Sequence, residues 1–401
     1  MLTKNIFLKN NFKKNSNFKN ISTTKKFFLK LKKDYEENKI PLLKSFTKKY
    51  QLGYSKKKIK NLSKEKNIIL VGMGGSILGA KAIYSFLKPK IKKNFLFQDN
   101  LSERSNIELN LRKIKNTAYI FISKSGNTIE TVANINLILQ NNKKINNKIF
   151  ITENKKNAIS EISEKLKTEI IEHKNFIGGR YSVMSEVGML PAELMGLNIK
   201  KFKNLNHLIK NKNFVQNLVE NVNSLYNFYR EAKTNLIILN YDQDMTDLSY
   251  WYQQLIAESL GKHGKGFLPL VSTVPKDNHS LLQLYLDGPR NNFFTIFQSK
   301  HVKKTELKKF YLPKSLKYLT NKSIENILDA KTIATEKAFT KKNIPFRTFY
   351  FSKKNEQELG AIFTFFVLET LLLSRLMNVN PFNQPSVEII KNETKKILLR
   401  N

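Results

Sequence analysis

The stretches GMGGSILGA (Gly72–Ala80) and SKSGNTIET (Ser123–Thr131) decide the fold that we predict for this chain. Each follows an apolar run typical of a buried strand, NIIL or AYIFI, and each leads into an amphipathic helical segment. We therefore expect two strand-to-helix turns that face one crevice at the edge of a parallel sheet. Glycines, hydroxyls and helix N-termini together favour an anion, so the pair predicts a sugar-phosphate site.

Each turn also has a simpler interpretation. A glycine cluster after a strand can serve only to let a helix pack closely on a sheet, and a hydroxyl at a helix start can serve only as a cap. Capping needs one hydroxyl, whereas Ser123, Ser125 and Thr128 cluster beside Lys124, which favours phosphate binding. The glycine spacing does not fit the dinucleotide pattern GxGxxG, and a Walker A lysine is absent from the sequence.

Length and composition limit the possibilities further. A chain of 401 residues is long enough for two domains, each with a core of its own. It has no cysteine, which suits a reducing compartment, and we expect it to be cytoplasmic. The five histidines lack metal-ligand spacing, so we expect no metal.

The net charge of +38 suggests nucleic-acid binding as one interpretation. However, only eight of the 70 basic residues are arginine, and the lysines are spread along the chain together with abundant Asn, Ile and Phe. We interpret the charge as a compositional bias that attracts anionic substrates, and we expect no specific nucleic-acid partner.

Strand and helix patterns alternate along most of the chain. The runs IILVG, FLFQD, AYIFIS, KIFIT and EIIEH predict one doubly wound parallel sheet within residues 66–200. After a long helical stretch at about 201–232, the alternation restarts at NLIILN and continues through FFTIF and FRTFYF, which predicts a second such sheet within 201–378. The fold class is thus α/β with two doubly wound parallel-sheet domains, followed by a helical tail over 379–401.

The basic N-terminal region, residues 1–65, is the least informative part. We expect residues 1–20 to be poorly ordered and 21–65 to form one or two helices on the first domain. A secretory signal is excluded because no uninterrupted apolar segment is present, whereas an organellar presequence stays open as an alternative.

The apolar stretch from Leu359 to Met377 is long enough to cross a membrane. Glu369, Ser374 and Arg375 interrupt its second half, and a carboxylate near the middle of a bilayer costs about 2.5 kcal/mol or more. We expect a helix buried in a domain core or a dimer interface, and no membrane association.

Four more segments complete a pattern along the chain: GGRYSVMSEVGMLP (Gly178–Pro191), QLIAESLGKHGKG (Gln254–Gly266), NHSLLQLYLDGP (Asn278–Pro289) and NPFNQPSVEIIK (Asn380–Lys391). In order and spacing, the six segments resemble the phosphoglucose isomerase family. The resemblance implies two sugar-isomerase domains with the active site between them, a homodimer, a sugar-phosphate substrate and no cofactor. It implies the interconversion of glucose 6-phosphate and fructose 6-phosphate through an enediolate.

The resemblance also implies a role for particular residues. Glu258 would be the proton-transferring base, Arg180 the cation beside the enediolate, and His279 the ring-opening group supplied by the neighbouring subunit. Lys391 would be the catalytic lysine of the tail, paired with Gln384. Without the resemblance, Glu258 could equally be a solvated helical carboxylate and His279 a cap or surface residue. The residues expected to bind the substrate or its phosphate are Gly75, Ser76, Ser123, Lys124, Ser125, Thr128, Gln254 and Gln384.

The chain departs from the family pattern at several positions. Asn383, Ser386 and Ile390 stand where the family usually has Asp, Gly and Gly, and Asn127 replaces a hydroxyl residue of the phosphate turn. A β-branched residue at 390 disfavours a left-handed backbone, so the path of the tail is open. Two other functions remain: an isomerase that also accepts mannose 6-phosphate, and a regulator that binds a sugar phosphate without reacting.

Overall fold

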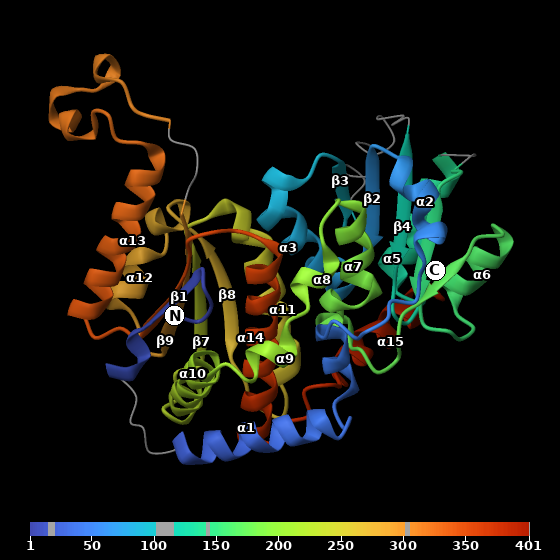
Figure 1. The fold of residues 1–401 in the computed structure, drawn as a ribbon, viewed down its shortest axis with the longest axis horizontal. Helices are drawn as coiled ribbons and strands as arrows, with labels where there is room; N and C mark the ends of the chain where they lie inside the picture. The colour runs from blue at the N-terminus through green and yellow to red at the C-terminus, as the bar shows by residue number, and fades with distance from the viewer. Residues whose placement is uncertain (15–20, 102–115, 142–144, 301–304, 401) are drawn as a thin grey trace.

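Two five-stranded sheets lie side by side in the computed structural model, which describes residues 1–14, 21–101, 116–141, 145–300 and 305–400 (Figure 1). The first sheet is parallel throughout, in the order β3-β2-β4-β5-β6. Its strands are β2 (Asn67–Gly72), β3 (Asn94–Gln98), β4 (Thr117–Ile122), β5 (Lys148–Thr152) and β6 (Ile170–Glu172). The five apolar runs of the first half therefore form the predicted doubly wound sheet.

The second sheet has the order β1-β10-β9-β7-β8. Four of its strands are parallel: β7 (Asn235–Asn240), β8 (Leu268–Thr273), β9 (Asn292–Ser299) and β10 (Phe346–Phe351). The fifth, β1 (Ile6–Asn10), pairs antiparallel with β10, with Ile6 opposite Phe351. The expectation of poor order over residues 1–20 is thus wrong for 6–10, because these residues pair with β10 at the sheet edge; residues 15–20 lie outside the described part.

Successive side chains along each strand point to opposite faces of the sheet and pack into different hydrophobic clusters, as burial of both faces requires. Ile68 and Leu70 of β2 and Leu236 of β7 face one large cluster that joins both sheets. Ile69 and Val71 of β2 face a second cluster under α5 (Ile129–Asn141) and α6 (Ala158–Lys165). The other face of β7 meets a third cluster under α13 (Ile324–Lys341). Each sheet is therefore covered on both faces.

Four helices join the two halves inside the shared core: α3 (Leu78–Leu87), α7 (Glu186–Leu194), α11 (Thr246–Leu260) and α14 (Glu356–Leu376). Helix α14 is long and apolar enough to span a bilayer, yet 89% of its most apolar window is buried inside the protein. Its Glu369 forms a fully buried ion pair with Arg347 of β10 and also accepts hydrogen bonds from Tyr252 and Asn221. The expected core helix is confirmed, and its carboxylate has partners for its charge.

The N-terminal helices differ in part from the expectation. Helix α2 (Lys56–Lys64) lies beside the first sheet, where Lys58 pairs with Glu169. Helix α1 (Ile21–Glu36) instead packs on α10 (Lys212–Arg230) and α14, and its Asp34 forms an ion pair with Arg375 (Figure 1). The single long helix expected over 201–232 is divided into α8 (Ile199–Phe202), α9 (Leu205–Leu208) and α10. The side chains of Asn198 and Asn211 cap the starts of α8 and α10.

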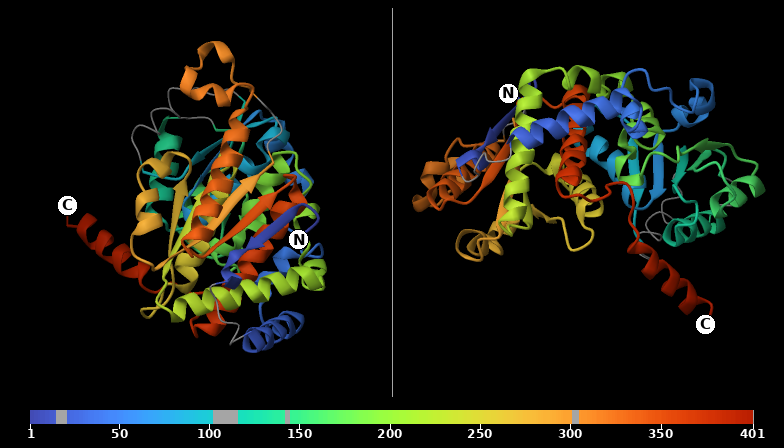
Figure 2. Two further views of the ribbon diagram at one scale, coloured as in Figure 1. Left: turned by 90° about the vertical axis from the view of Figure 1, so that its left-hand side faces the viewer. Right: turned by 90° about the horizontal axis from the view of Figure 1, so that it is seen from below.

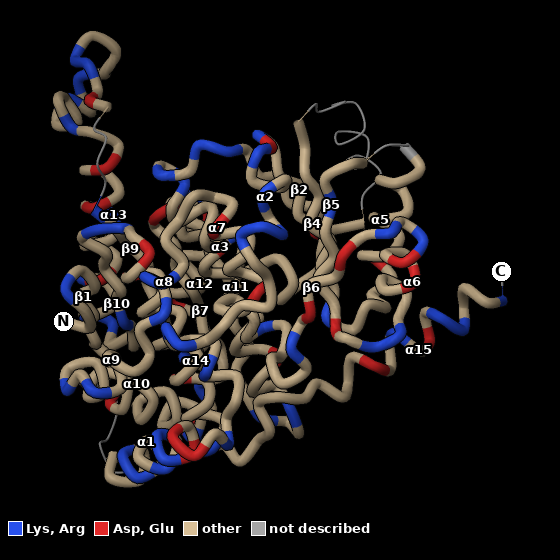
Figure 3. The backbone as a smooth tube through the Cα atoms, turned by 45° about the vertical axis from the view of Figure 1, so that its right-hand side comes forward, with Lys and Arg blue, Asp and Glu red and all other residues tan. Residues whose placement is uncertain are grey.

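Two segments project from the body. Residues 305–323 extend beyond α13, and the C-terminal helix α15 (Val387–Leu398) extends away from the sheets (Figures 1 and 2). α12 (Leu282–Asp287) follows the 3-10 turn Lys276–His279 near the edge strand β8. Lys and Arg are distributed over many elements (Figure 3).

Candidate active site

The two motif turns lie next to each other at the carboxyl edge of the first sheet. β2 leads through the 3-10 turn Gly74–Ser76 into α3, and β4 leads through residues 123–128 into α5. β2 and β4 are neighbouring parallel strands, with Gly72 opposite Ile122. Because the chain continues from β2 towards β3 and from β4 towards β5, on opposite sides, this is the switch point at which α/β sheets bind ligands.

Hydroxyl groups and backbone N–H groups line the second turn. Ser123 Oγ and Thr128 Oγ1 are 2.9 Å apart, and the Gly126 N–H donates to Ser123 Oγ over 3.1 Å. Gly126 has φ +71°, which bends the turn back on itself. Ser125 is exposed, and its hydroxyl accepts from the Asn127 N–H at 3.3 Å. Hydroxyls and a helix start can together hold a phosphate here.

Lys124 and Asn127 attach this turn to the loops behind it. The Lys124 ammonium donates to the Asn175 carbonyl over 2.9 Å and lies 3.6 Å from the Glu153 carboxylate. Burial lowers the pKa of Lys124. The Asn127 side chain accepts a hydrogen bond from the Ala158 N–H at 2.9 Å. The asparagine that stands here in place of a hydroxyl residue therefore connects the turn to the start of α6.

Arg180 reaches the site because two glycine-containing turns cross closely. Gly75 lies against the 3-10 helix Gly179–Met184, and a Cβ at position 75 would be 2.2 Å from the Gly179 carbonyl carbon. The Ser182 hydroxyl lies at the crossing, 2.7 Å from the Gly179 carbonyl and 3.2 Å from the Gly75 carbonyl, and shares its proton between these two acceptors. Ser76, also buried, closes this turn with its N–H on the Met73 carbonyl. Only a glycine at position 75 permits this approach.

The Arg180 guanidinium is buried and bonded on every side. Its Nη1 donates to Glu258 Oε2 at 3.2 Å and to Gln384 Oε1 at 3.1 Å. Its Nη2 donates to the carbonyls of Pro381 and Asn383. The side chain is only 3% exposed, so its charge acts in a medium of low polarity.

Glu258 lies in the last turn of α11, and its side chain is 33% exposed. Gln254, one turn earlier on the same face, donates from Nε2 to Glu258 Oε1 over 2.8 Å. Gln254 also touches Gly74, since a Cβ there would lie 2.8 Å from its Nε2. The Glu258 carboxylate, the Arg180 guanidinium and the first motif turn therefore lie together, and Gln254 and Gln384 contact them.

Lys262 is a cation at this site that we did not predict. Its Nζ donates to the Glu258 and Ser259 carbonyls at 2.8 and 2.7 Å, where it caps the end of α11. Burial, and then the nearby charge of Arg180, lower the pKa of Lys262 to about 8. Its place in the GKHGKG part of the motif, four residues after Glu258, is the signal that could have revealed it.

His279 and Lys391 are not joined to this group within the described chain. His279 is exposed at the end of its 3-10 turn, and no hydrogen bond or ion pair connects it with Glu258 or Arg180 among the described residues. Lys391 is exposed on α15, where its Nζ pairs with Glu388 of the same helix at 2.7 Å. Their expected roles therefore need another arrangement or another chain.

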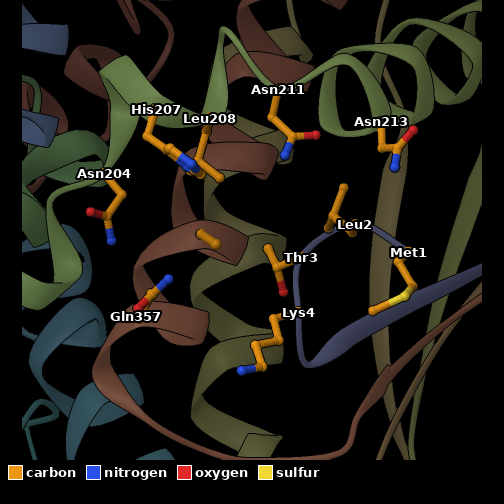
Figure 4. Close-up of a pocket in the computed structure, with 11 residues that line it drawn as sticks. Met1, Leu2, Thr3, Lys4, Asn204, His207, Leu208, Asn211, Asn213 and Gln357 are labelled. Carbon is orange, nitrogen blue, oxygen red and sulfur yellow. The ribbon is translucent and has the colours of Figure 1, made fainter.

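Two further features of the described chain bear on where a ligand could bind. Its residues contain no group of three or more His, Asp or Glu side chains that could hold a metal ion. A hollow of about 330 Å³ is lined by the N-terminal residues 1–4, by His207 and by several amide and aliphatic side chains, and none of the predicted site residues lines it (Figure 4).

Comparison with known proteins gives the family of this arrangement. The model of the phosphoglucose isomerase family matches residues 34–400. The chain belongs to the phosphoglucose isomerase family. It is 33% identical over 355 residues to the glucose-6-phosphate isomerase of Methanocaldococcus jannaschii, and the aligned region covers 86% of each chain. It is 29% identical over 347 residues to that of Campylobacter jejuni, covering 83% of this chain and 85% of the relative.

Solved structures share the fold. A hypothetical protein of Thermus thermophilus superposes with a TM-score of 0.77 at 22% identity, over 91% of this chain and 89% of that one. A glucose-6-phosphate isomerase of Chlamydia trachomatis superposes with a TM-score of 0.71 at 18% identity, over 84% and 70%. The family resemblance seen in the six segments is thus confirmed, and so is the α/β fold with two parallel-sheet halves.

Proposed function

We propose that this protein catalyses the reversible isomerisation of glucose 6-phosphate and fructose 6-phosphate. Family membership and the relatives named glucose-6-phosphate isomerase support the substrate pair. The observation that carries the proposal is the contact of Arg180 Nη1 with Glu258 Oε2 at 3.2 Å, beside the glycine turn of a phosphate-binding switch point. A base and a fixed cation are what proton transfer through an enediolate requires.

In the proposed reaction, the turn over residues 123–128 holds the phosphate while the sugar ring opens. The Glu258 carboxylate takes the proton from C2 of the open-chain aldose, and the electron pair moves onto the C1 carbonyl oxygen to give the enediolate. Arg180 Nη1 stabilises the negative oxygen. Protonated Glu258 then returns the proton to C1, and the proton of the C2 hydroxyl moves to the C1 oxygen, which leaves the ketose.

We propose that a second copy of the chain completes the site. Ring opening needs an acid and a base, and His279 and Lys391 both lie on exposed segments. α15 also carries exposed apolar side chains that a stable assembly would cover, namely Val387, Ile389, Ile390, Ile397, Leu398 and Leu399. A homodimer would place the His279 segment of one copy at the crevice of the other.

We also propose that the chain divides into four regions, residues 1–65, 66–200, 201–378 and 379–401, and that the protein is located in the cytoplasm.

A coupled assay tests the activity. Purified protein is given fructose 6-phosphate, and glucose 6-phosphate is followed with an excess of its NADP-dependent dehydrogenase. We expect turnover with no added metal and with no organic cofactor other than the NADP that the coupling dehydrogenase uses. Failure to form glucose 6-phosphate from fructose 6-phosphate would contradict the proposal. Mannose 6-phosphate with the same coupling enzymes shows whether the site accepts the C2 epimer.

Mixing two inactive chains tests the shared site. His279→Ala and Glu258→Gln chains are refolded together, and hybrid dimers are isolated by different affinity tags. A hybrid contains one intact site if His279 acts across the interface, so a fraction of wild-type activity should return. Isolated hybrids that stay inactive would show that each site is built from one chain.

A further inference from the structure

The edge of the Arg180 guanidinium that turns away from Glu258 has its own partners. Arg180 Nε donates to Ser259 Oγ over 2.8 Å, and Ser259 Oγ lies 2.8 Å from Tyr181 Oη. Tyr181 Oη donates to the Pro381 carbonyl over 3.1 Å, and Arg180 Nη2 donates to the same carbonyl. Arg180, Ser259, Tyr181 and Pro381 therefore form a closed ring of hydrogen bonds, which we call the arginine ring.

Two members of the arginine ring, the Arg180 guanidinium and the Pro381 carbonyl, determine the direction of each hydrogen bond. A guanidinium can only donate and a carbonyl can only accept. Since Tyr181 uses its one proton on Pro381, Ser259 must give its proton to Tyr181 and accept from Arg180 Nε with a lone pair. Burial raises the pKa of Tyr181, which keeps the phenol protonated at neutral pH.

Buried serines in helices usually have a simpler partner, and this chain contains one for comparison. Ser249 lies in the same helix α11 and is as fully buried as Ser259, and its hydroxyl donates to the Met245 carbonyl one turn earlier at 2.9 Å. The Ser259 hydroxyl instead bonds two side chains of another element. Packing alone does not require this arrangement.

We propose that Ser259 and Tyr181 are positioning residues for Arg180, holding its Nε and Nη2 so that Nη1 faces Glu258 and the reacting carbons. The inference rests on the isomerase function proposed above. Removing the Ser259 hydroxyl leaves a buried charged donor without its acceptor and removes the bond that fixes the Nε edge of the guanidinium. The Ser259 and Tyr181 hydroxyls affect the reaction only through the position of Arg180.

The first test compares Ser259→Ala with Ser249→Ala, the same substitution at equal burial in the same helix. We expect Ser259→Ala to lower kcat by about tenfold to a hundredfold, with KM changed by less than about threefold, and Ser249→Ala to stay near wild type. Tyr181→Phe should give a smaller loss of the same kind. A Ser259→Ala enzyme within about threefold of wild-type kcat would overturn the proposal.

The second test separates positioning from packing. Lysine has no Nε–H donor, so in an Arg180→Lys background Ser259→Ala should lower kcat by less than about threefold further. A full further loss of about tenfold or more would mean that Ser259 acts by packing, and the proposal fails. Thermal unfolding of each variant confirms that the compared proteins are folded.

A third measurement does not depend on activity. The ¹H–¹⁵N signal of Arg180 Nε, identified by its absence in Arg180→Lys, should be protected from exchange with water in the wild type and in Ser249→Ala. It should lose that protection in Ser259→Ala. An unprotected signal in the wild type, or an unchanged one in Ser259→Ala, overturns the proposal even if the substrate is a different sugar phosphate.

Discussion

Replacing Gly75 with alanine should displace Arg180 and reduce catalysis while leaving the fold in place. The new Cβ would lie 2.2 Å from the Gly179 carbonyl carbon and 2.5 Å from the Arg180 nitrogen, both backbone atoms that cannot rotate away. Carbon atoms are comfortable at about 3.5 Å, so the backbone under Arg180 must move by about 1 Å. A shift of that size at a catalytic group costs about a hundredfold in rate, and overpacking costs about 1–3 kcal/mol of stability.

The assay is kcat/KM for fructose 6-phosphate together with urea unfolding of the same preparations. Gly53→Ala is the matched control, because a Cβ there meets Glu186 Oε1 at an ordinary 3.5 Å and lies in another loop. We expect kcat/KM to fall about a hundredfold for Gly75→Ala and to change less than about threefold for Gly53→Ala. A folded Gly75→Ala enzyme with more than about a tenth of wild-type kcat/KM would refute the argument that this crossing places Arg180.

A buried ion pair, a buried lysine and the hydroxyl turn provide three independent tests. Glu369→Gln leaves the fully buried charge of Arg347 without its partner and should lower the free energy of unfolding in urea by about 3–5 kcal/mol. The control Glu388→Gln, on exposed α15, should lower it by less than about 0.5 kcal/mol. A loss below about 1 kcal/mol for Glu369→Gln would contradict this prediction. Burial lowers the pKa of Lys203 from 10.5 to about 8, so between these values the unfolded chain binds more protons and stability rises with pH. Relative to Lys203→Met, the wild type should gain about 2–4 kcal/mol over that range, and parallel curves would argue against the shift. Ser125→Ala combined with Thr128→Ala should weaken inhibition by inorganic phosphate by about 1–3 kcal/mol, whereas unchanged inhibition would place the anion elsewhere.

The interior strands and the two turns of the first sheet were predictable because their signals are local. A strand buried on both faces appears as an apolar run, and a ligand-binding turn appears as glycines and hydroxyls directly after it. The two edge strands of the second sheet, β1 and β8, lack this signal. β1 has an alternating pattern in which only Ile6 is fully buried, and its partner β10 lies more than 300 residues away. β8 exposes Leu268 and Leu270 and contains Pro269, which is tolerated because β8 is also an edge strand.

The site was predictable as a set of residues but not as a geometry. The family motifs indicated Arg180, Glu258 and Gln384, which lie far apart in the sequence and meet only after both halves pack together. The contacts of Ser259 and Lys262 depend on how α11 ends beside Arg180, which no local pattern encodes. The roles of His279 and Lys391 stay predictions, because both residues are exposed and would reach an active site only in an assembly with a second chain.

Hydrogen exchange at the substrate gives the most direct test of the central claim that Glu258 moves a proton through an enediolate. Fructose 6-phosphate is incubated in D₂O with the wild type or with Glu258→Gln, and the products are followed by ¹H NMR. The substitution should not disturb the fold, since the Gln254 amide can turn its unpartnered Oε1 towards the new NH₂ group. The wild type should form glucose 6-phosphate whose C2 carries deuterium in the fraction of turnovers in which protonated Glu258 exchanges with D₂O before it returns the proton. Glu258→Gln should form glucose 6-phosphate at least about a thousandfold more slowly. Turnover by Glu258→Gln above about a tenth of the wild-type rate would contradict the account.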